Sequence, residues 1–290
     1  MELVANYPPE LEVNVYRQLH NDLAHMSDEA LSEHYKLHGR SEGRIGNRLV
    51  QRESFTALIG PDVKALEIGP LATPLLKGEN VRYCDIMDQE GLKERAIGIG
   101  LDPNQVPFIS YVLGPEGLDG IKEDFDAVLS SHCIEHQPDL VRHLQQVQRR
   151  LEARGGRYFV LAPDKRYCFD HYISETTIAD IIDAHYGART VHTLRNVIEH
   201  RALSTHNDAV VHWQAHAAKQ TIDSTKIRDA INEWLSANGS YIDVHAWYLT
   251  PDSFAENIGL LRHLGFIQLS VERLYATRYG AGEFWAILSL

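Results

Sequence analysis

Cysteine is scarce in this sequence, and long hydrophobic runs are absent. Only Cys84, Cys133 and Cys168 occur in 290 residues, widely spaced and odd in number. That pattern supports neither a disulfide framework nor a Cys-x-x-Cys metal site, and it favours a reducing compartment. No window approaches the roughly 20 consecutive apolar residues of a membrane-spanning helix. The start, MELVANYPPELEVN, lacks the features of a signal peptide, so we expect a cytoplasmic protein.

Positive charge is also in short supply. The chain carries 28 Lys and Arg against 40 Asp and Glu, a formal net charge of −12. This balance disfavours a generic nucleic-acid binder. The remaining composition is ordinary, at 44% hydrophobic and 23% charged residues. The length therefore suffices for one large hydrophobic core with a small satellite, and neither disorder nor a small stapled scaffold explains the chain.

The N-terminal part of the chain has a helical pattern. Ser27 precedes an acidic first turn, and apolar residues recur at helical spacing over residues 30–35, so Ser27 is the expected N-cap. A second helical pattern runs over residues 49–59 and ends at a Gly-Pro pair. We predict a small helical module at residues 1–46 and a larger domain at residues 47–290.

The larger domain contains short apolar runs typical of buried parallel strands. They occupy residues 63–68, 81–84, 108–112, 125–130 and 157–162. A helix is expected over residues 140–151, and the alternation of strand and helix indicates a parallel sheet with crossovers. Residues 265–275 and 283–290 have the pattern of two adjacent strands in a C-terminal antiparallel hairpin.

Residues 163–250 interrupt this alternation with a mostly helical pattern that is rich in histidine. The segment is longer than a normal loop, so we expect an inserted lid or acceptor-binding layer. The predicted fold class is α/β: a Rossmann-like, doubly wound, mostly parallel sheet with a C-terminal antiparallel hairpin. A small N-terminal helical module and a helical insert complete it.

Polar residues follow directly after the predicted strands, where open parallel sheets bind their ligands. Glu67 and Gly69 follow the first strand, and a glycine there allows close approach of a ligand to the backbone. Asp85 follows the second strand, 18 positions beyond Glu67, where dinucleotide-type folds place a ribose-binding carboxylate. The pattern favours a nucleoside site. The Gly-x-Gly-x-x-Gly turn of an NAD-dependent oxidoreductase is missing.

Four segments carry a resemblance to a known family: ALEIGP, CDIMD, FDAVLSSHCIEHQPDLVRHL and GGRYFVLAPDKRYCFD. Over residues 60–170 the chain resembles the class I S-adenosylmethionine-dependent methyltransferases. SSHCIEHQPD, PDKRYCFD and IDVHAWYLTPDSF are similar to a bacterial group associated with glycan and surface-polysaccharide biosynthesis. Residues 22–44 resemble a module that precedes glycosyltransferase and methyltransferase domains of surface-polysaccharide enzymes.

This resemblance implies S-adenosylmethionine as the cofactor. Glu67 is expected near its ammonium, Asp85 on its ribose and Ile86 beside its adenine. Leu71 and Thr73 depart from the family, which has further glycines there. The implied cofactor-binding residues are Glu67, Gly69, Pro70, Asp85, Ile86, Ser131 and His132.

Catalytic candidates come from the same strand ends. Methyl transfer to a hydroxyl needs a base, and an imidazole with a pKa of about 6.5 can take the proton at neutral pH. The candidates are His132, His136, Asp164 and His245. An equally weighted alternative makes His132 a residue that positions the cofactor.

Substrate-binding candidates are Lys165, Arg166 and Trp247. A guanidinium matches a carboxylate or phosphate, and an aromatic ring beside a polar residue is a common platform for sugars. Two structural alternatives stay open: Asp164 and Arg166 form an internal pair that fixes the insert, and Trp247 belongs to the core.

Sixteen histidines raise the question of a metal. His132 and His136, and likewise His212 and His216, are spaced i, i+4. However, HWQAH lacks the glutamate of a zinc-protease motif, and no cysteine pair supports a structural zinc site. We therefore predict no metal ligand. A divalent ion held by histidines and carboxylates of the insert is the minority alternative.

These features together predict an S-adenosylmethionine-dependent methyltransferase that O-methylates a saccharide or glycan precursor. The expected partners are a small-molecule or saccharide acceptor and other glycan-biosynthesis enzymes, with no nucleic acid and no membrane span. One alternative is a methyltransferase acting on a natural-product or lipid hydroxyl. Another is a non-catalytic cofactor-binding module in a biosynthetic assembly.

Overall fold

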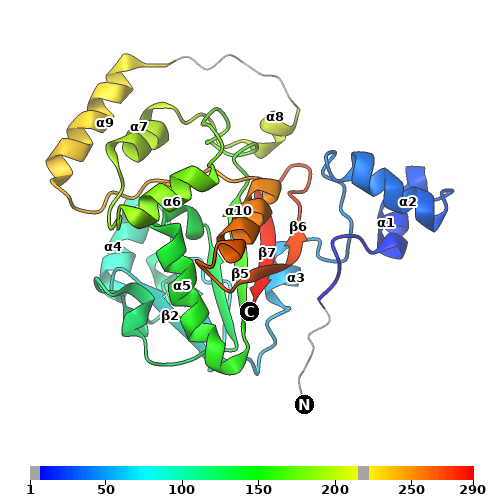
Figure 1. The fold of residues 1–290 in the computed structure, drawn as a ribbon, viewed down its shortest axis with the longest axis horizontal. Coiled ribbons are helices and arrows are strands. Elements are labelled where there is room, and N and C mark those ends of the chain that lie inside the picture. Colours follow the sequence, from blue (N-terminus) through cyan, green and yellow to red (C-terminus); the bar gives the residue numbers. More distant parts are fainter. Residues whose placement is uncertain (1–6, 215–221) are drawn as a thin grey trace.

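The computed structural model describes residues 7–214 and 222–290. Within these ranges seven strands form one sheet in the order β3-β2-β1-β4-β5-β7-β6 (Figure 1). The strands are β1 (Ala65–Ile68), β2 (Val81–Asp85), β3 (Tyr111–Val112), β4 (Ala127–Ser131), β5 (Arg157–Pro163), β6 (Ser270–Tyr275) and β7 (Glu283–Ser289). Neighbouring strands from β3 to β5 are parallel, whereas β7 runs antiparallel to both β5 and β6. The predicted Rossmann-like sheet with a C-terminal antiparallel hairpin is confirmed.

Helices cover the sheet and extend beyond it. They are α1 (Val13–Leu19), α2 (Asp28–His34), α3 (Arg52–Thr56), α4 (Gln89–Gly98), α5 (Leu140–Leu151), α6 (Ile178–Tyr186), α7 (Leu194–Ala202), α8 (Ala209–Trp213), α9 (Ser224–Ala237) and α10 (Pro251–His263). Short 3-10 turns are η1 (Asn21–Leu23), η3 (Pro103–Gln105), η4 (Gly117–Gly120), η5 (Ile134–His136) and η6 (Glu152–Arg154), and η2 (Tyr35–Gly39) is a π-turn.

The strand predicted at residues 108–112 is much shorter than expected. Only Tyr111 and Val112 pair with β2, at the edge of the sheet. Pro107 has no backbone N–H to give to a ladder. Phe108 is 74% exposed, and Ile109 packs with α4 instead. The apolar run therefore serves a local cluster rather than the sheet.

Both faces of the sheet are buried, which explains why the strands have almost continuous apolar sequences. Along β5, Tyr158 and Val160 join a core that contains the inner residues of α5, α6 and α10. Phe159 and Leu161 point to the opposite face and pack with Phe55 of α3. The alternation of side chains along a strand thus supplies two cores from one run of sequence.

Helix α5 has the length and the ends that the sequence predicts. Asp139 caps it by accepting a hydrogen bond of 2.9 Å from the backbone N–H of Arg142. Leu144 and Val147 lie on its buried face, against the sheet. After the turn η6, Gly155 takes a left-handed conformation that releases the chain into β5.

The N-terminal helices have a small core of their own. Ser27 accepts a hydrogen bond from the backbone of Ala30, so the predicted cap of α2 is confirmed. Tyr16 and Leu31 are fully buried within this cluster. Figure 1 shows α1 and α2 to one side of the sheet. The domain boundary at residue 46 stays a prediction.

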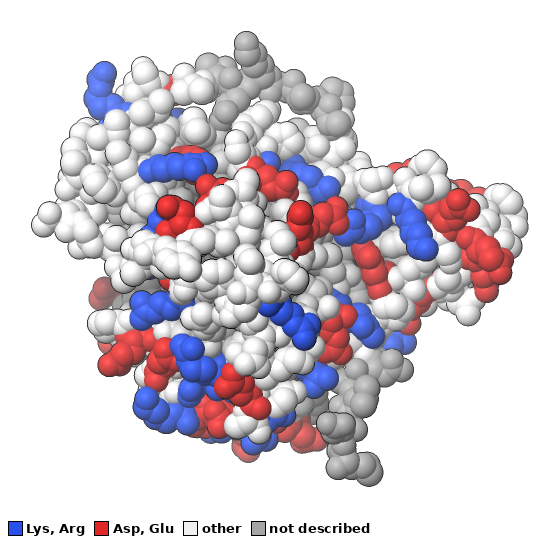
Figure 2. All heavy atoms as spheres, viewed as in Figure 1, with Lys and Arg blue, Asp and Glu red and all other residues white. Residues whose placement is uncertain are grey.

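Helices of the insert lie over the carboxyl edge of the parallel strands (Figure 1). Val197 of α7 packs with Ala230 of α9 and with Val244 in the segment that returns to the sheet. Basic and acidic side chains are interspersed on the face shown in Figure 2. Among the described residues, no helix combines the length and the apolar character that a membrane crossing requires.

Replacing Leu144 with alanine tests the packing of α5. Leu144 is fully buried, so Leu144→Ala is expected to lower the free energy of unfolding by about 2–5 kcal/mol. The matched change Leu37→Ala, at a side chain that is 63% exposed, should stay within about 0.5 kcal/mol. Urea denaturation of both variants measures the difference, and equal losses would contradict the assigned core.

Candidate functional site

Two cavities open at the carboxyl edge of the sheet, around the switch point between β1 and β4. There, crossovers leave in opposite directions, and open α/β sheets bind ligands in the resulting crevice. The first cavity measures about 520 Å³ and the second about 580 Å³. His132, His136 and Asp243 line both of them. The two cavities are therefore neighbours that share a polar wall.

The loop after β1 forms one side of the first cavity. Gly69 has a φ of +68° and donates a hydrogen bond of 2.9 Å to the carbonyl of Cys84, which ties the turn to β2. Leu71 also adopts a left-handed conformation, with a φ of +44°. Such a conformation costs a non-glycine residue about 1–3 kcal/mol. The chain thus adopts a glycine-type backbone conformation at a leucine, which also lines the cavity.

Glu67 binds the backbone of this loop and does not line the cavity. Its two carboxylate oxygens accept hydrogen bonds from the backbone N–H groups of Leu75 (2.9 Å) and Leu76 (2.8 Å). The side chain is buried, and burial raises the pKa of Glu67 to about 7. Glu67 is therefore a loop anchor in this structure, and its expected contact with a cofactor ammonium stays a prediction.

Asp85, at the end of β2, faces the first cavity together with the half-exposed Ile86. Its carboxylate accepts one long hydrogen bond of 3.4 Å from the backbone of Met87, so acceptor capacity remains for a ligand. Burial raises the pKa of Asp85 above its ordinary value. On the far wall, Arg95 forms an ion pair with Asp243.

His132 follows β4 in a left-handed conformation, with a φ of +49°. Its Nε2 lies 2.7 Å from a carboxylate oxygen of Glu283 and 3.1 Å from Arg52. Burial alone would lower the pKa of His132, but the hydrogen bond to Glu283 and the charge of Glu135 raise it overall. Burial would raise the pKa of Glu283, yet hydrogen bonds from His132 and Arg52 lower it to about 2. The geometry is that of an imidazole held by a carboxylate.

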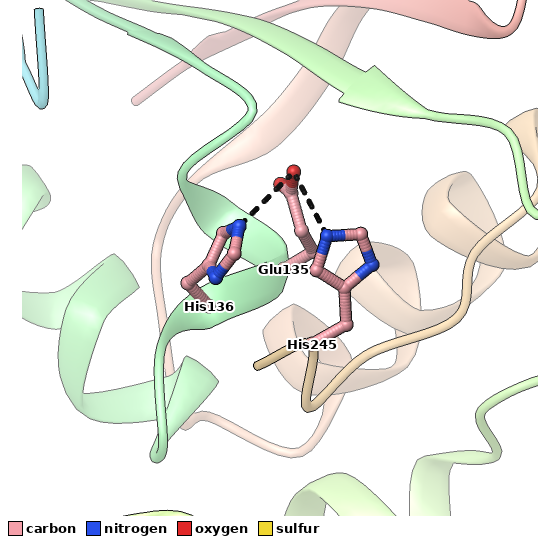
Figure 3. A group of neighbouring side chains, drawn as sticks. All are labelled: Glu135, His136 and His245. Carbon is pink, nitrogen blue, oxygen red and sulfur yellow. Dashed lines mark ion pairs between the residues drawn. The ribbon is translucent and has the colours of Figure 1, made fainter. Parts of the chain in front are cut away.

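A second group of polar side chains lies deeper in the wall of the second cavity. Glu135 and His136 belong to η5, and His245 lies in the chain that returns from the insert. One nitrogen of each ring points toward the Glu135 carboxylate, at 3.9 Å (Figure 3). The other nitrogen of His245 lies 2.7 Å from Asp170.

The predicted residues fall into two groups. Neither cavity within the described ranges is lined by Pro70, Ser131, Lys165, Arg166 or Trp247, nor by Glu67 or Asp164. The residues that do line a cavity are Gly69, Asp85, Ile86, His132, His136 and His245. Some predicted cofactor residues and the predicted catalytic histidines thus lie together at the carboxyl edge of the sheet.

The predicted residues that line neither cavity make contacts that fit their structural alternatives, an internal Asp164–Arg166 pair and a core position for Trp247. Asp164 is fully buried and binds Arg166 (2.6 Å) and the hydroxyl of Thr277 (2.7 Å). Trp247 lies in the main core and donates to the carbonyl of Gln137. Catalytic or substrate-binding roles for Asp164, Lys165, Arg166 and Trp247 stay predictions. His216, of the weighed pair His212/His216, lies outside the described residues.

Sequence reasoning missed several groups that surround the site. Glu283 begins the antiparallel strand β7, and its partner in the ladder is Pro163 at the end of β5. An antiparallel strand brings its first residue to the edge where parallel strands bring their last, so the predicted hairpin already contained this signal. Asp170 belongs to the segment after the fifth predicted strand, which the sequence places at the same edge. Glu135 and Asp243 carried no comparable signal, because only folding of the insert brings them together.

No family model matches the chain, and no curated protein matches it. Solved structures with similar folds include a methyltransferase of Clostridium acetobutylicum that depends on S-adenosylmethionine. It is 9% identical in sequence, the match spans 91% of this chain and 98% of the other, and the TM-score is 0.41. The CcbJ methyltransferase of Streptomyces caelestis is 11% identical, covers 82% and 88%, and has a TM-score of 0.39.

The mitomycin 7-O-methyltransferase MmcR is 13% identical, with a TM-score of 0.38 over 92% of this chain. The present chain spans 59% of the length of MmcR. Likeness at this level carries no inference about activity. The strand order and the reversed β7 themselves define a Rossmann-like, doubly wound sheet closed by an antiparallel hairpin.

The buried carboxyl of Glu67 should make stability depend on pH. Its folded-state pKa of about 7 lies above the ordinary value of 4.5, so the folded protein holds this proton more tightly than the unfolded chain. The resulting stability is fully present below pH 4.5 and is lost as the pH rises through about 7, by on the order of 3 kcal/mol.

Glu67→Gln is expected to remove this pH-dependent loss, because an amide does not ionise. Thermal unfolding between pH 4.5 and 8 measures how steeply stability changes with pH. This slope, and not the absolute stability, is compared between the variants. Glu90→Gln, at a highly exposed side chain of α4, is the control and should keep the wild-type slope. An unchanged slope in Glu67→Gln would show that Glu67 is ionised throughout this range.

Proposed function

We propose that this protein is an S-adenosylmethionine-dependent methyltransferase that acts on a hydroxyl of a saccharide or glycan precursor. The supporting observation is the pair of cavities at the switch point, with His132 and His136 in the wall that they share. One cavity then suits the cofactor and the other the acceptor, because methyl transfer requires the two reactants to meet in line.

The first cavity fits the cofactor. Its volume of about 520 Å³ lies within the range of small-molecule sites, roughly 300–1,000 Å³. The turn at Gly69 exposes backbone to the cavity, Asp85 offers free acceptor capacity for ribose hydroxyls, and Ile86 presents an apolar surface for a base. When bound, S-adenosylmethionine supplies a methyl group already activated on a sulfonium.

The second cavity fits a hydroxyl-bearing acceptor. Glu135, His200 and His245 give its wall many hydrogen-bonding groups, and Tyr167 and Phe169 add aromatic faces. This mixture suits a polyol better than a lipid chain. The insert supplies more than half of the residues that line the second cavity and few of those that line the first, which supports its proposed role as the acceptor layer. The choice of a saccharide rests on the sequence resemblance.

His132 is the proposed general base. Because a carboxylate only accepts hydrogen bonds, the contact with Glu283 assigns a proton to Nε2, and Arg52 then pairs with Glu283 rather than with the ring. Nδ1, which lies 3.7 Å from Glu135, is the nitrogen left to accept a proton. The acceptor hydroxyl gives its proton to Nδ1 as its oxygen bonds to the methyl carbon. With S-adenosylmethionine held in the first cavity, the carbon–sulfur bond would break in the same step and leave its electron pair on sulfur. His132, whose side chain is 40% exposed, then passes the proton to solvent.

Asp85→Ala tests the cofactor site. The ribose hydroxyls lose their acceptor, so calorimetric titration should show S-adenosylhomocysteine affinity reduced at least about tenfold. Glu90→Ala, at an exposed carboxylate of the neighbouring helix α4, should bind like the wild type. Unchanged affinity in Asp85→Ala, or no binding by the wild type, would overturn the assignment; the latter would favour a non-catalytic module.

His132→Asn tests the base. Asparagine tolerates the left-handed backbone of residue 132, so the loop should keep its shape. We expect turnover to fall by about 10²–10⁴-fold while S-adenosylhomocysteine affinity stays within about threefold. Release of S-adenosylhomocysteine with a panel of nucleotide sugars, oligosaccharides and lipid alcohols measures turnover, and His263→Asn, at an exposed residue of α10, is the control. Loss of affinity in His132→Asn would instead assign His132 to cofactor positioning.

A further inference from the structure

Glu135 is a buried carboxylate that lacks the partners such a group needs. Its side chain is 1% exposed, and neither of its oxygens has a hydrogen-bond partner among the described residues. Three imidazole nitrogens surround Oε1: Nδ1 of His132 at 3.7 Å, and the Nε2 atoms of His136 and His245 at 3.9 Å each. All three distances are too long for a hydrogen bond. A buried charge without a partner costs several kcal/mol, so this arrangement points to a missing cation.

The other nitrogen of each histidine lies close to a carboxylate. Nδ1 of His136 lies 3.0 Å from Asp243, and Nδ1 of His245 lies 2.7 Å from Asp170. Since a carboxylate only accepts, the hydrogen bond to Asp170 places the proton of His245 on Nδ1 and directs its Nε2 lone pair toward Glu135. The ion-pair contact with Asp243 favours the same tautomer for His136. Carboxylate–histidine pairs of this kind orient and strengthen histidine ligands in metal sites.

We infer that Glu135, His136 and His245 bind one divalent transition-metal ion at the wall between the two cavities (Figure 3). Two imidazoles and one carboxylate suit Zn²⁺, Mn²⁺ or Fe²⁺, whereas Mg²⁺ prefers oxygen ligands. Bonds of about 2.1 Å at tetrahedral angles separate ligand atoms by about 3.4 Å. The two N–O distances of 3.9 Å therefore need a closure of about half an ångström, and all three ligand atoms lie within 4.8 Å of one another.

A second group, Asp170, His200 and His245, also brings three ligand atoms together. The contacts of these residues make the group of Glu135, His136 and His245 the better metal site. The short contact between Asp170 and Nδ1 of His245 is a hydrogen bond, and Nδ1 of His200 accepts from the backbone N–H of His245. These contacts take up Oδ2 of Asp170 and Nδ1 of His200 and leave Oδ1 as the only oxygen of Asp170 without a partner, whereas both oxygens of Glu135 lack a partner among the described residues.

The three ligands leave coordination positions open toward the second cavity, which all three residues line. An acceptor hydroxyl bound there would be polarised by the metal and would lose its proton to His132 more readily. This role rests on the proposed methyltransferase function. Binding of the metal itself does not, so the two can be tested apart.

The experiment titrates the full-length protein, freed of metal with EDTA, with Co²⁺ and Zn²⁺. Visible absorbance reports Co²⁺ in a histidine–carboxylate site, and calorimetry reports Zn²⁺. We expect one ion per chain and no binding of Mg²⁺ at the same concentrations. Glu135→Gln and His245→Ala should weaken binding more than about 100-fold, and Asp170→Asn about 10–100-fold. His263→Gln, at an exposed histidine, should bind like the wild type.

Thermal unfolding confirms that each variant is folded, and Glu135→Gln keeps the shape of the side chain in case His245→Ala does not fold. Wild-type protein that binds neither Co²⁺ nor Zn²⁺ would overturn the metal site, as would undiminished binding by folded Glu135→Gln. Titration with S-adenosylhomocysteine in the same samples separates the two hypotheses. Metal binding without cofactor binding supports the metal site and contradicts the proposed function. Cofactor binding without metal binding supports the proposed function and contradicts the metal site.

Discussion

Burial of both faces of the sheet constrains everything else in this structure. Strands β4 and β5 place apolar side chains alternately into two cores, at about 25 cal/mol for each Å² of apolar surface removed from water. A polar side chain within either core would need a partner there. Polar groups from different strands therefore gather where the strands end, and the two cavities lie at that edge.

The reversed strand β7 brings an acid to the same edge. Its first residue, Glu283, lies opposite Pro163 at the end of β5. From there it contacts both Arg52, just before the buried part of α3, and His132 after β4. One carboxylate thus connects three segments that are far apart in the sequence. Its pKa of about 2 keeps it charged at any pH where the protein is expected to be folded.

Strain and unpaired charge are concentrated at the site. Leu71 and His132 both take left-handed conformations that cost a non-glycine residue about 1–3 kcal/mol, and both line the first cavity. Glu135 adds the cost of a buried carboxylate without a hydrogen-bond partner among the described residues. Stability elsewhere, in the two cores and at the cap of α5, offsets these costs. Left-handed backbone conformations and unpaired buried charges of this kind are typical of binding and catalytic sites, where the rest of the fold provides enough stability to keep them.

Local sequence was sufficient for the elements whose signals are local. Hydrophobic period and the glycines that follow predicted helix α5 at residues 140–151, and the order of strands and helices predicted the parallel sheet. Of the residues predicted at the ends of β1, β2 and β4, Gly69, Asp85 and His132 line the first cavity, because parallel strands end at one edge. The apolar run at residues 108–112 misled, since periodicity does not distinguish an edge strand from a loop that packs on a helix.

Tertiary structure alone placed the insert over that edge. His245 is 110 residues beyond Glu135, and no local period links them. Packing of α7 against α9 and the return segment brings His245 and Asp170 to the η5 turn. Likewise, the same Asp-x-Arg spacing at Asp164 and Arg166 is compatible with a substrate site or an internal pair, and burial of Asp164 beside Thr277 favours the pair. Residue type sets the chemistry a side chain can perform, but its neighbours in space determine which chemistry is available, and those neighbours come from distant parts of the chain.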